Sequence, residues 1–162
     1  MYPYSMPTDY RVNPFKPYPP NSKCEPCGTA DTKLAQQLSC LGFKKFARIV
    51  TLSGLKNLDD RRLTIFAVPD LYISEDYLKT CGRMAAINIL RSSTMPNNIP
   101  TTLLSQSGNA FYASLNRQFN LHIYFENSRM MVDGINCIGG DHKDGKITVH
   151  VLDTLINPPC IS

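Results

Sequence analysis

Apolar side chains recur every three or four residues in two early segments of the chain, and this spacing predicts two amphipathic helices. The first spans residues 31–41, with Asp31 or Thr32 as its N-cap. The second spans residues 43–53, and Gly54 follows it at a position suited to the left-handed conformation that ends many helices. Two further short helices are expected. One begins after Ser74, which is a suitable N-cap, and the other follows Gly82 over residues 84–90.

The remaining apolar segments are short and rich in β-branched and aromatic residues, so they predict strands. One covers residues 63–68 and ends at Pro69, and the others cover residues 110–115, 121–125, 130–132, 135–138 and 147–155. Asp133-Gly134 predicts a tight hairpin turn. Residues 92–100 and 139–145 are expected to be loops, because both are polar and rich in proline, asparagine or glycine.

Ile147, Val149 and Val151 alternate with Thr148, His150 and Leu152, which predicts a strand with one face in the core. The whole order is helices, one strand, helices and then a run of strands joined by short turns. This order favours an α+β fold with mainly antiparallel strands over a doubly wound parallel sheet.

The first 30 residues differ in composition from the rest. Seven of the 12 prolines and four of the eight tyrosines lie there. Proline fixes φ and removes a backbone donor, so residues 1–30 are expected to form an extended tail. Residues 31–160 are expected to form a single domain, which suits the chain length of 162 residues.

Composition excludes several classes of protein. Hydrophobic residues make up 43% and charged residues 19%, which is typical of a folded domain. The net charge of +4 is small and scattered, so no nucleic-acid partner is indicated. No apolar stretch is long enough for membrane insertion, and no secretory signal peptide is visible.

The chain contains six cysteines, Cys24, Cys27, Cys40, Cys81, Cys137 and Cys160. An even number at wide spacing favours disulfides and an oxidising compartment, with pairing left open among 15 possibilities. The alternative is six reduced thiols. Cys24 and Cys27 form a CxxC pair that could also serve zinc or redox chemistry, but no second ligand pair accompanies it.

No catalytic or cofactor motif is present, so no catalytic residue, metal ligand or cofactor is predicted. The three histidines, His122, His142 and His150, do not stand at metal-ligand spacing from cysteines or carboxylates. The sequence therefore favours a protein that is not an enzyme.

Four segments resemble motifs of the fasciclin domain family. Residues 63–70 are similar to its "T-v-F-A-P-t-d" strand, and residues 149–159 to its closing "v-H-V-I-D-x-V-L-x-P-P". Residues 131–135 resemble its "v-N-G-a" hairpin, and residues 46–55 its "l-l-x-x-a-G-L" helix. These segments occur in the family's order over residues 31–159.

The resemblance implies a fasciclin-like wedge or sandwich of two mainly antiparallel β-sheets with several short helices packed on it. It also implies a secreted or extracellular protein, a monomer or weak oligomer, that acts in adhesion by binding an integrin or a matrix protein. Partner-binding candidates follow from the family's Tyr-His position, here Ile87 and Asn88, and from its acidic segment before the closing strand, here Asp141 and His142. The resemblance assigns His150 a structural role.

Two other functions remain open. The domain could carry an apolar small molecule such as a carotenoid, lined by Ile87, Ile89, Leu90, Leu103 and Leu104. It could instead be a structural coat protein crosslinked through the tyrosines of residues 1–30. Pigment or lipid in native material would indicate the first, and dityrosine fluorescence the second.

Overall fold

Two amphipathic helices open the part of the chain that this computed structural model describes, residues 32–156. They are α2 (Lys33–Cys40) and α3 (Lys44–Ser53), as the apolar spacing predicted. The Thr32 hydroxyl caps α2 by accepting a hydrogen bond from the Ala35 amide at 3.1 Å. Gly54 ends α3 at φ 70°, the left-handed conformation expected for it.

The two most buried strands lie side by side. They are β1 (Leu63–Ala67) and β7 (Ile147–Leu152), and they pair in parallel from Leu63 opposite Ile147 to Ala67 opposite Val151. The other strands are β2 (Thr94–Pro96), β3 (Ala110–Ala113), β4 (Asn120–Glu126), β5 (Arg129–Val132) and β6 (Ile135–Asp144). Strands β1 and β7 lie between the edge strand β2 and strand β6. All other pairings are antiparallel, so the α+β fold with a mainly antiparallel sheet is confirmed.

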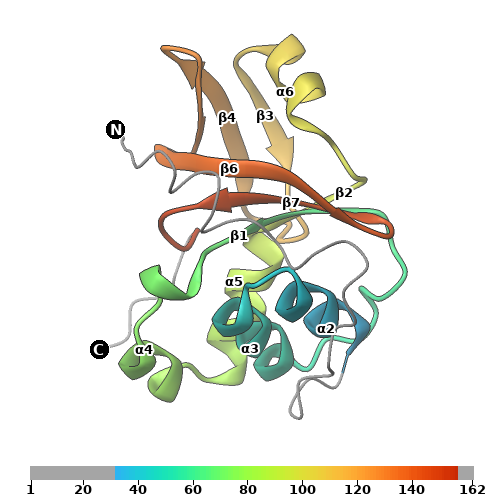
Figure 1. Ribbon diagram of the computed structural model, residues 1–162, viewed down its shortest axis with the longest axis vertical. Helices are drawn as coiled ribbons and strands as arrows, with labels where there is room; N and C mark the ends of the chain where they lie inside the picture. The colour runs from blue at the N-terminus through green and yellow to red at the C-terminus, as the bar shows by residue number, and fades with distance from the viewer. Residues whose placement is uncertain (1–31, 157–162) are drawn as a thin grey trace.

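The expectation of two separate sheets needs correction. Within residues 32–156 the strands form one seven-stranded sheet, in the order β2-β1-β7-β6-β5-β4-β3. Strand β6 joins the two halves, because its first residues pair with β5 and the rest pair with β7. Its register shifts on either side of Gly139. Figure 1 shows the result, with β3 and β4 standing apart from the layer of β1, β6 and β7.

Three segments differ from their predictions. Residues 92–100 contain the edge strand β2, where Pro96 is tolerated because no neighbour requires its missing amide. The unpredicted helix α6 (Thr101–Ser107) follows. Residues 139–145 are mostly strand β6 rather than a loop. The turn between β6 and β7 contains Gly145 at φ 62°.

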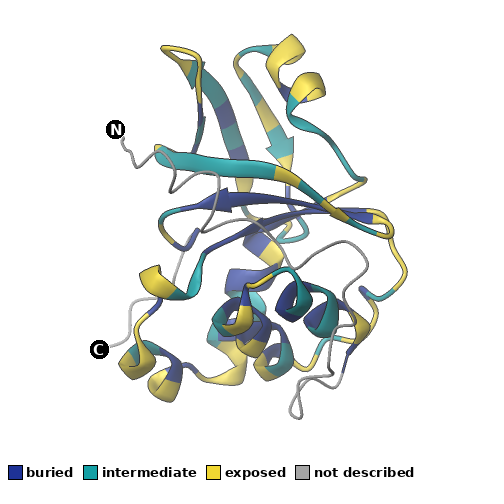
Figure 2. Cartoon of the chain, in the orientation of Figure 1, coloured by how far each residue is buried: buried dark blue, intermediate teal, exposed yellow. Residues whose placement is uncertain are grey.

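The helices cover one face of strands β1 and β7. Helices α2, α3 and α5 (Arg83–Ser92) lie against β1 and β7, and their inward sides are buried (Figures 1 and 2). Strand β7 is buried at all six residues, so the prediction that only one of its faces is in the core was wrong. The other face of β1 and β7 is covered by residues 97–101. His150 of β7 contacts the Ile99 carbonyl, and the Thr64 hydroxyl of β1 forms hydrogen bonds with Asn97 and Ile99.

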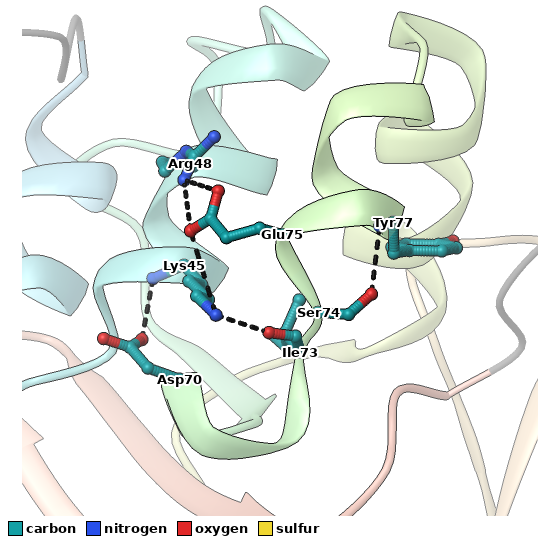
Figure 3. Close-up of polar contacts among 7 residues, drawn as sticks. All are labelled: Lys45, Arg48, Asp70, Ile73, Ser74, Glu75 and Tyr77. Carbon is teal, nitrogen blue, oxygen red and sulfur yellow. Dashed lines mark hydrogen bonds and ion pairs between the residues drawn. The ribbon is translucent and has the colours of Figure 1, made fainter.

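Helix α4 (Glu75–Thr80) is held to α3 by a small polar network (Figure 3). Asp70, in a 3₁₀ turn (Asp70–Tyr72), accepts a hydrogen bond from the Lys45 amide at 2.8 Å. Arg48 donates to both carboxylate oxygens of Glu75 at 3.1 Å. Ser74 caps α4 by accepting from the Tyr77 amide at 3.0 Å, as predicted.

The predicted tail, residues 1–30, lies outside the described residues, as does the end of the predicted domain beyond Ile156. None of the helices within residues 32–156 combines the length and apolar character that a membrane crossing requires.

Candidate functional site

A pocket of about 730 Å³ opens between three segments that are far apart in the sequence. Its walls are residues 55–61 after α3, one side of α5, and residues 114–118 between β3 and β4. Met84, Ile87, Asn88 and Arg91 line it from α5, because their spacing places them on one face of that helix. Two predicted partner-binding residues, Ile87 and Asn88, therefore line one pocket.

The wall formed by residues 114–118 is held in place by a dense set of hydrogen bonds. The Ser114 hydroxyl lies 2.5 Å from the Phe119 carbonyl and 3.0 Å from the Asn116 carbonyl. The Asn116 side-chain amide donates to Asn88 at 3.1 Å and to Ser92 at 3.0 Å. These contacts hold the loop against α5 and so fix this wall of the pocket.

A second surface feature is a row of aromatic side chains across β3 and β4. Phe111 lies directly opposite His122, and their rings stack at 4.4 Å between centroids with 12° between planes. Tyr124, two residues further along β4, lies 4.8 Å from the His122 ring. Met131 of β5 pairs with Tyr124 and continues the row. We call Phe111, His122, Tyr124 and Met131 the aromatic face.

The aromatic face is accessible although its rings are held in place. Phe111 is 70% exposed, whereas Leu121 and Ile123 on the opposite side of the same sheet are buried. Nε2 of His122 lies 2.7 Å from the side-chain oxygen of Asn109, which fixes the orientation of the imidazole ring. The face therefore offers rigid apolar area to a partner.

The other two partner-binding candidates, Asp141 and His142, lie in β6 and do not line the pocket. Asp141 falls at the register shift, with φ 57°, and its carboxylate accepts from the Thr101 amide at 3.0 Å. The half-buried His142 ring packs edge-on against Phe43, with 6.2 Å between centroids. Both side chains thus make contacts within the domain, and Asp141 is exposed.

His150 lies fully buried between β6 and residues 97–101. Its Nδ1 accepts from the Asp141 amide at 3.3 Å, and its Nε2 lies 2.9 Å from the Ile99 carbonyl. The proton of the neutral ring is therefore on Nε2. Burial lowers the pKa of both His150 and His142, because charging either ring would require desolvation of a cation. Although its partial burial acts the other way, hydrogen bonds from Thr101 hold the pKa of Asp141 below its usual value.

The cysteines depart from the expected disulfide framework. Cys81 and Cys137 are free thiols. The Cys81 thiol donates to the Gly82 carbonyl at 3.7 Å, and the Cys137 thiol donates to the Gly139 carbonyl at 3.1 Å. Burial raises the pKa of Cys137 to about 12 and also raises that of Cys81. Cys40, at the end of α2, is not a free thiol. Cys24, Cys27 and Cys160 lie outside the described residues.

The suggested lining of an apolar carrier site is not brought together. Ile89, Leu90 and Leu104 are fully buried in the core, and Leu103 is half-exposed on α6. Of these five residues, only Ile87 lines the pocket. In residues 32–156 no three histidine, cysteine or acidic side chains are grouped as a metal ion would need.

Sequence reasoning missed both the aromatic face and the arginines of the pocket, Arg61, Arg91 and Arg117. The alternation of Leu121, His122, Ile123 and Tyr124 was a visible signal for one face of β4. The stacking partner of His122 depends on the register between β3 and β4, which no local pattern specifies. The arginines belong to three separate segments.

The fold is fasciclin-like. The chain is similar to a FAS1 domain pair from the insect cell adhesion molecule fasciclin I, with a TM-score of 0.58 and 18% sequence identity. The similarity covers 73% of this chain and 46% of that chain, so this chain spans less than half of the domain pair. No protein-family model matches the sequence, and the search of curated proteins found no match.

Proposed function

We propose that this protein is a non-enzymatic extracellular interaction module of the adhesion type, which binds another protein through its aromatic face. The fasciclin-like fold supports an adhesion-type module, since the similar structure comes from a cell adhesion molecule. An integrin or a matrix protein is the class of partner that we propose, with the domain itself a monomer or weak oligomer.

The observation that carries this proposal is the exposed stack of Phe111 on His122. Aromatic side chains are enriched at the centres of protein interfaces, where each buries a large area. Because the stack and the Asn109 contact already restrict these rings, a partner would lose little binding free energy to ordering them. Helices α2, α3 and α5 leave this part of the sheet uncovered, as Figure 1 shows.

An oxidising compartment is a further part of the proposal. We assign the disulfides to Cys24, Cys27, Cys40 and Cys160, because Cys81 and Cys137 are free thiols and Cys40 is not. Four cysteines allow three pairings, and we leave the choice among them open.

The test compares two exposed hydrophobic residues. Phe111→Ser removes the most exposed ring of the aromatic face. Leu71→Ser removes a side chain of the 3₁₀ turn that is 76% exposed and does not belong to this face. Fluorescently labelled full-length protein is applied to integrin-bearing cells and to surfaces coated with collagen or fibronectin. We expect Phe111→Ser to reduce binding at least ten-fold and Leu71→Ser to leave it unchanged.

Equal binding by both variants would refute the assignment of the aromatic face. Absence of binding to every one of these surfaces would refute the proposed class of partner. Circular dichroism of each variant shows whether a loss of binding reflects a loss of folding.

A further inference from the structure

Each wall of the pocket contributes one arginine. Arg61 comes from the segment after α3, Arg91 from α5, and Arg117 from the loop between β3 and β4. Among residues 32–156, no acidic residue lines the pocket. Three positive charges therefore face one cavity, which creates a positive potential there.

In the part of the chain that the structure describes, these charges have no side-chain partner. In residues 32–156 the ion pairs involve other cations, and none of the three arginines forms a side-chain hydrogen bond there. The two acids beside Arg61 are engaged elsewhere. Asp59 accepts from the Leu34 amide at 2.9 Å, and Asp60 pairs with Lys33.

The rest of the lining is mixed. Five apolar side chains contribute to it, those of Leu55, Leu58, Met84, Ile87 and Leu115. Asparagine and glutamine side chains complete the wall between the arginines. A neutral hydrocarbon would leave the arginines unpaired, and a small inorganic ion would leave the apolar wall uncovered. A ligand that satisfies both must carry a negative group on an apolar body.

We propose that the pocket binds a small amphiphilic organic anion, a carboxylate or a sulfate ester on an aliphatic or aromatic body. The volume of about 730 Å³ is in the range of ordinary small-molecule sites. Guanidinium groups pair with carboxylate and sulfate oxygens through charge-assisted hydrogen bonds, often two at a time. The apolar body lies against α5, and the anionic group lies between the arginines. This site is separate from the aromatic face, so either proposal can fail alone.

The experiment titrates the full-length protein with octanoate, octyl sulfate and 1-octanol by calorimetry. We expect one site for at least one anion and binding of 1-octanol at least ten-fold weaker. Binding of octanoate alone identifies a carboxylate site, binding of octyl sulfate alone identifies a sulfate site, and binding of both supports a general oxyanion site. Equal affinity for 1-octanol, or no binding of either anion at millimolar concentration, would overturn the proposal.

Arg62, which follows Arg61 in the sequence, provides a matched control for the arginines of the pocket. Arg61→Gln, Arg91→Gln and Arg117→Gln should each weaken the anion about five- to ten-fold. Arg62→Gln changes the net charge equally but lies outside the pocket, so it should leave affinity unchanged. An equal loss with Arg62→Gln would indicate nonspecific charge attraction and contradict the assigned site. Because all four residues are exposed, the variants should fold, and shifts of the Asn116 side-chain amide in NMR spectra provide a second readout of occupancy.

Discussion

Gly140 leaves the space that the imidazole of His150 occupies. A Cβ atom added at Gly140 would lie 2.7 Å from Nδ1 of His150, closer than real Cβ atoms approach other heavy atoms. The same nitrogen accepts the amide hydrogen of Asp141, the next residue. The glycine therefore permits the contact by which the closing strand β7 meets β6 at its register shift.

Gly140→Ala should destabilise the protein by about 1–3 kcal/mol, as overpacking of a tight core does. The measurement is the free energy of unfolding in urea. Gly82→Ala is the control, since nothing lies within 4 Å of a Cβ at that position. A loss at Gly140 no larger than the loss at Gly82 would contradict the close approach.

Stability should fall in mild acid because His150 and His142 are buried in neutral form. Their pKa values are lowered in the folded protein, so the unfolded chain binds more protons below its own histidine pKa, which is about 6.5. The stabilisation is fully present above that pH and declines as the pH falls toward the folded-state values. The slope cannot exceed about 1.4 kcal/mol per pH unit for each histidine. The nearby carboxylate of Asp141 opposes the shift in both rings without reversing it.

Urea unfolding between pH 7.5 and 5 measures this slope. His150→Gln keeps one donor and one acceptor but does not titrate, so its stability should depend less on pH, and the double variant with His142→Gln should depend least. A slope unchanged in the double variant would assign it to other groups.

Local patterns predicted the elements whose determinants are adjacent in sequence. The apolar spacing of α2 and α3 and the hairpin at Asp133-Gly134, where φ is 54° and 80°, depend on neighbouring residues only. Helix α6 was missed because it buries only Leu104 and its N-terminus is capped from β6 by Asp141. Strand β6 was cut short because Gly139-Gly140 signals a loop, although here these glycines accommodate the register shift and His150.

The candidate sites were less visible because each depends on register or on distant segments. Ile87 and Asn88 were singled out from the family resemblance, and they line the pocket. Arg61 was read as part of a solvated turn, because nothing in its neighbourhood shows that Arg91 and Arg117 face the same cavity. Asp141 and His142 were taken for a polar loop. His142 instead pairs with Val149 of β7 and packs against Phe43, and Asp141 lies at the register shift and accepts from the Thr101 amide.

Helix α3 should depend on Asp70 more than on its surface ion pair. The N-cap residue Phe43 has no side-chain acceptor, and Asp70 supplies the missing hydrogen bond to the Lys45 amide from 25 residues away. Asp70→Ala should cost about 1 kcal/mol, as loss of an N-cap does. Glu75→Gln should cost less and only at low salt, because the pair with Arg48 is about half-exposed.

Urea unfolding at 20 mM and 500 mM salt distinguishes these two contributions. The loss in Asp70→Ala should persist at high salt, and Asp70→Asn should recover part of it because the amide oxygen can still accept. A loss in Glu75→Gln that is larger than in Asp70→Ala and independent of salt would reverse this ranking.

Cys81 and Cys137 should resist alkylation until the protein unfolds. The thiolate is the reactive species, and a pKa of about 12 keeps Cys137 almost entirely as the unreactive thiol at pH 8. Cys81 is buried, with 6% of its surface exposed, and its pKa is also raised. Iodoacetamide should therefore add little mass to the native protein.

In guanidinium without reductant, iodoacetamide should modify two cysteines. After reduction it should modify all six, if the other four form disulfides. Peptide mapping should place the two early modifications at Cys81 and Cys137. Rapid native labelling of Cys137, or recovery of either residue in a disulfide-linked peptide, would contradict the arrangement described here.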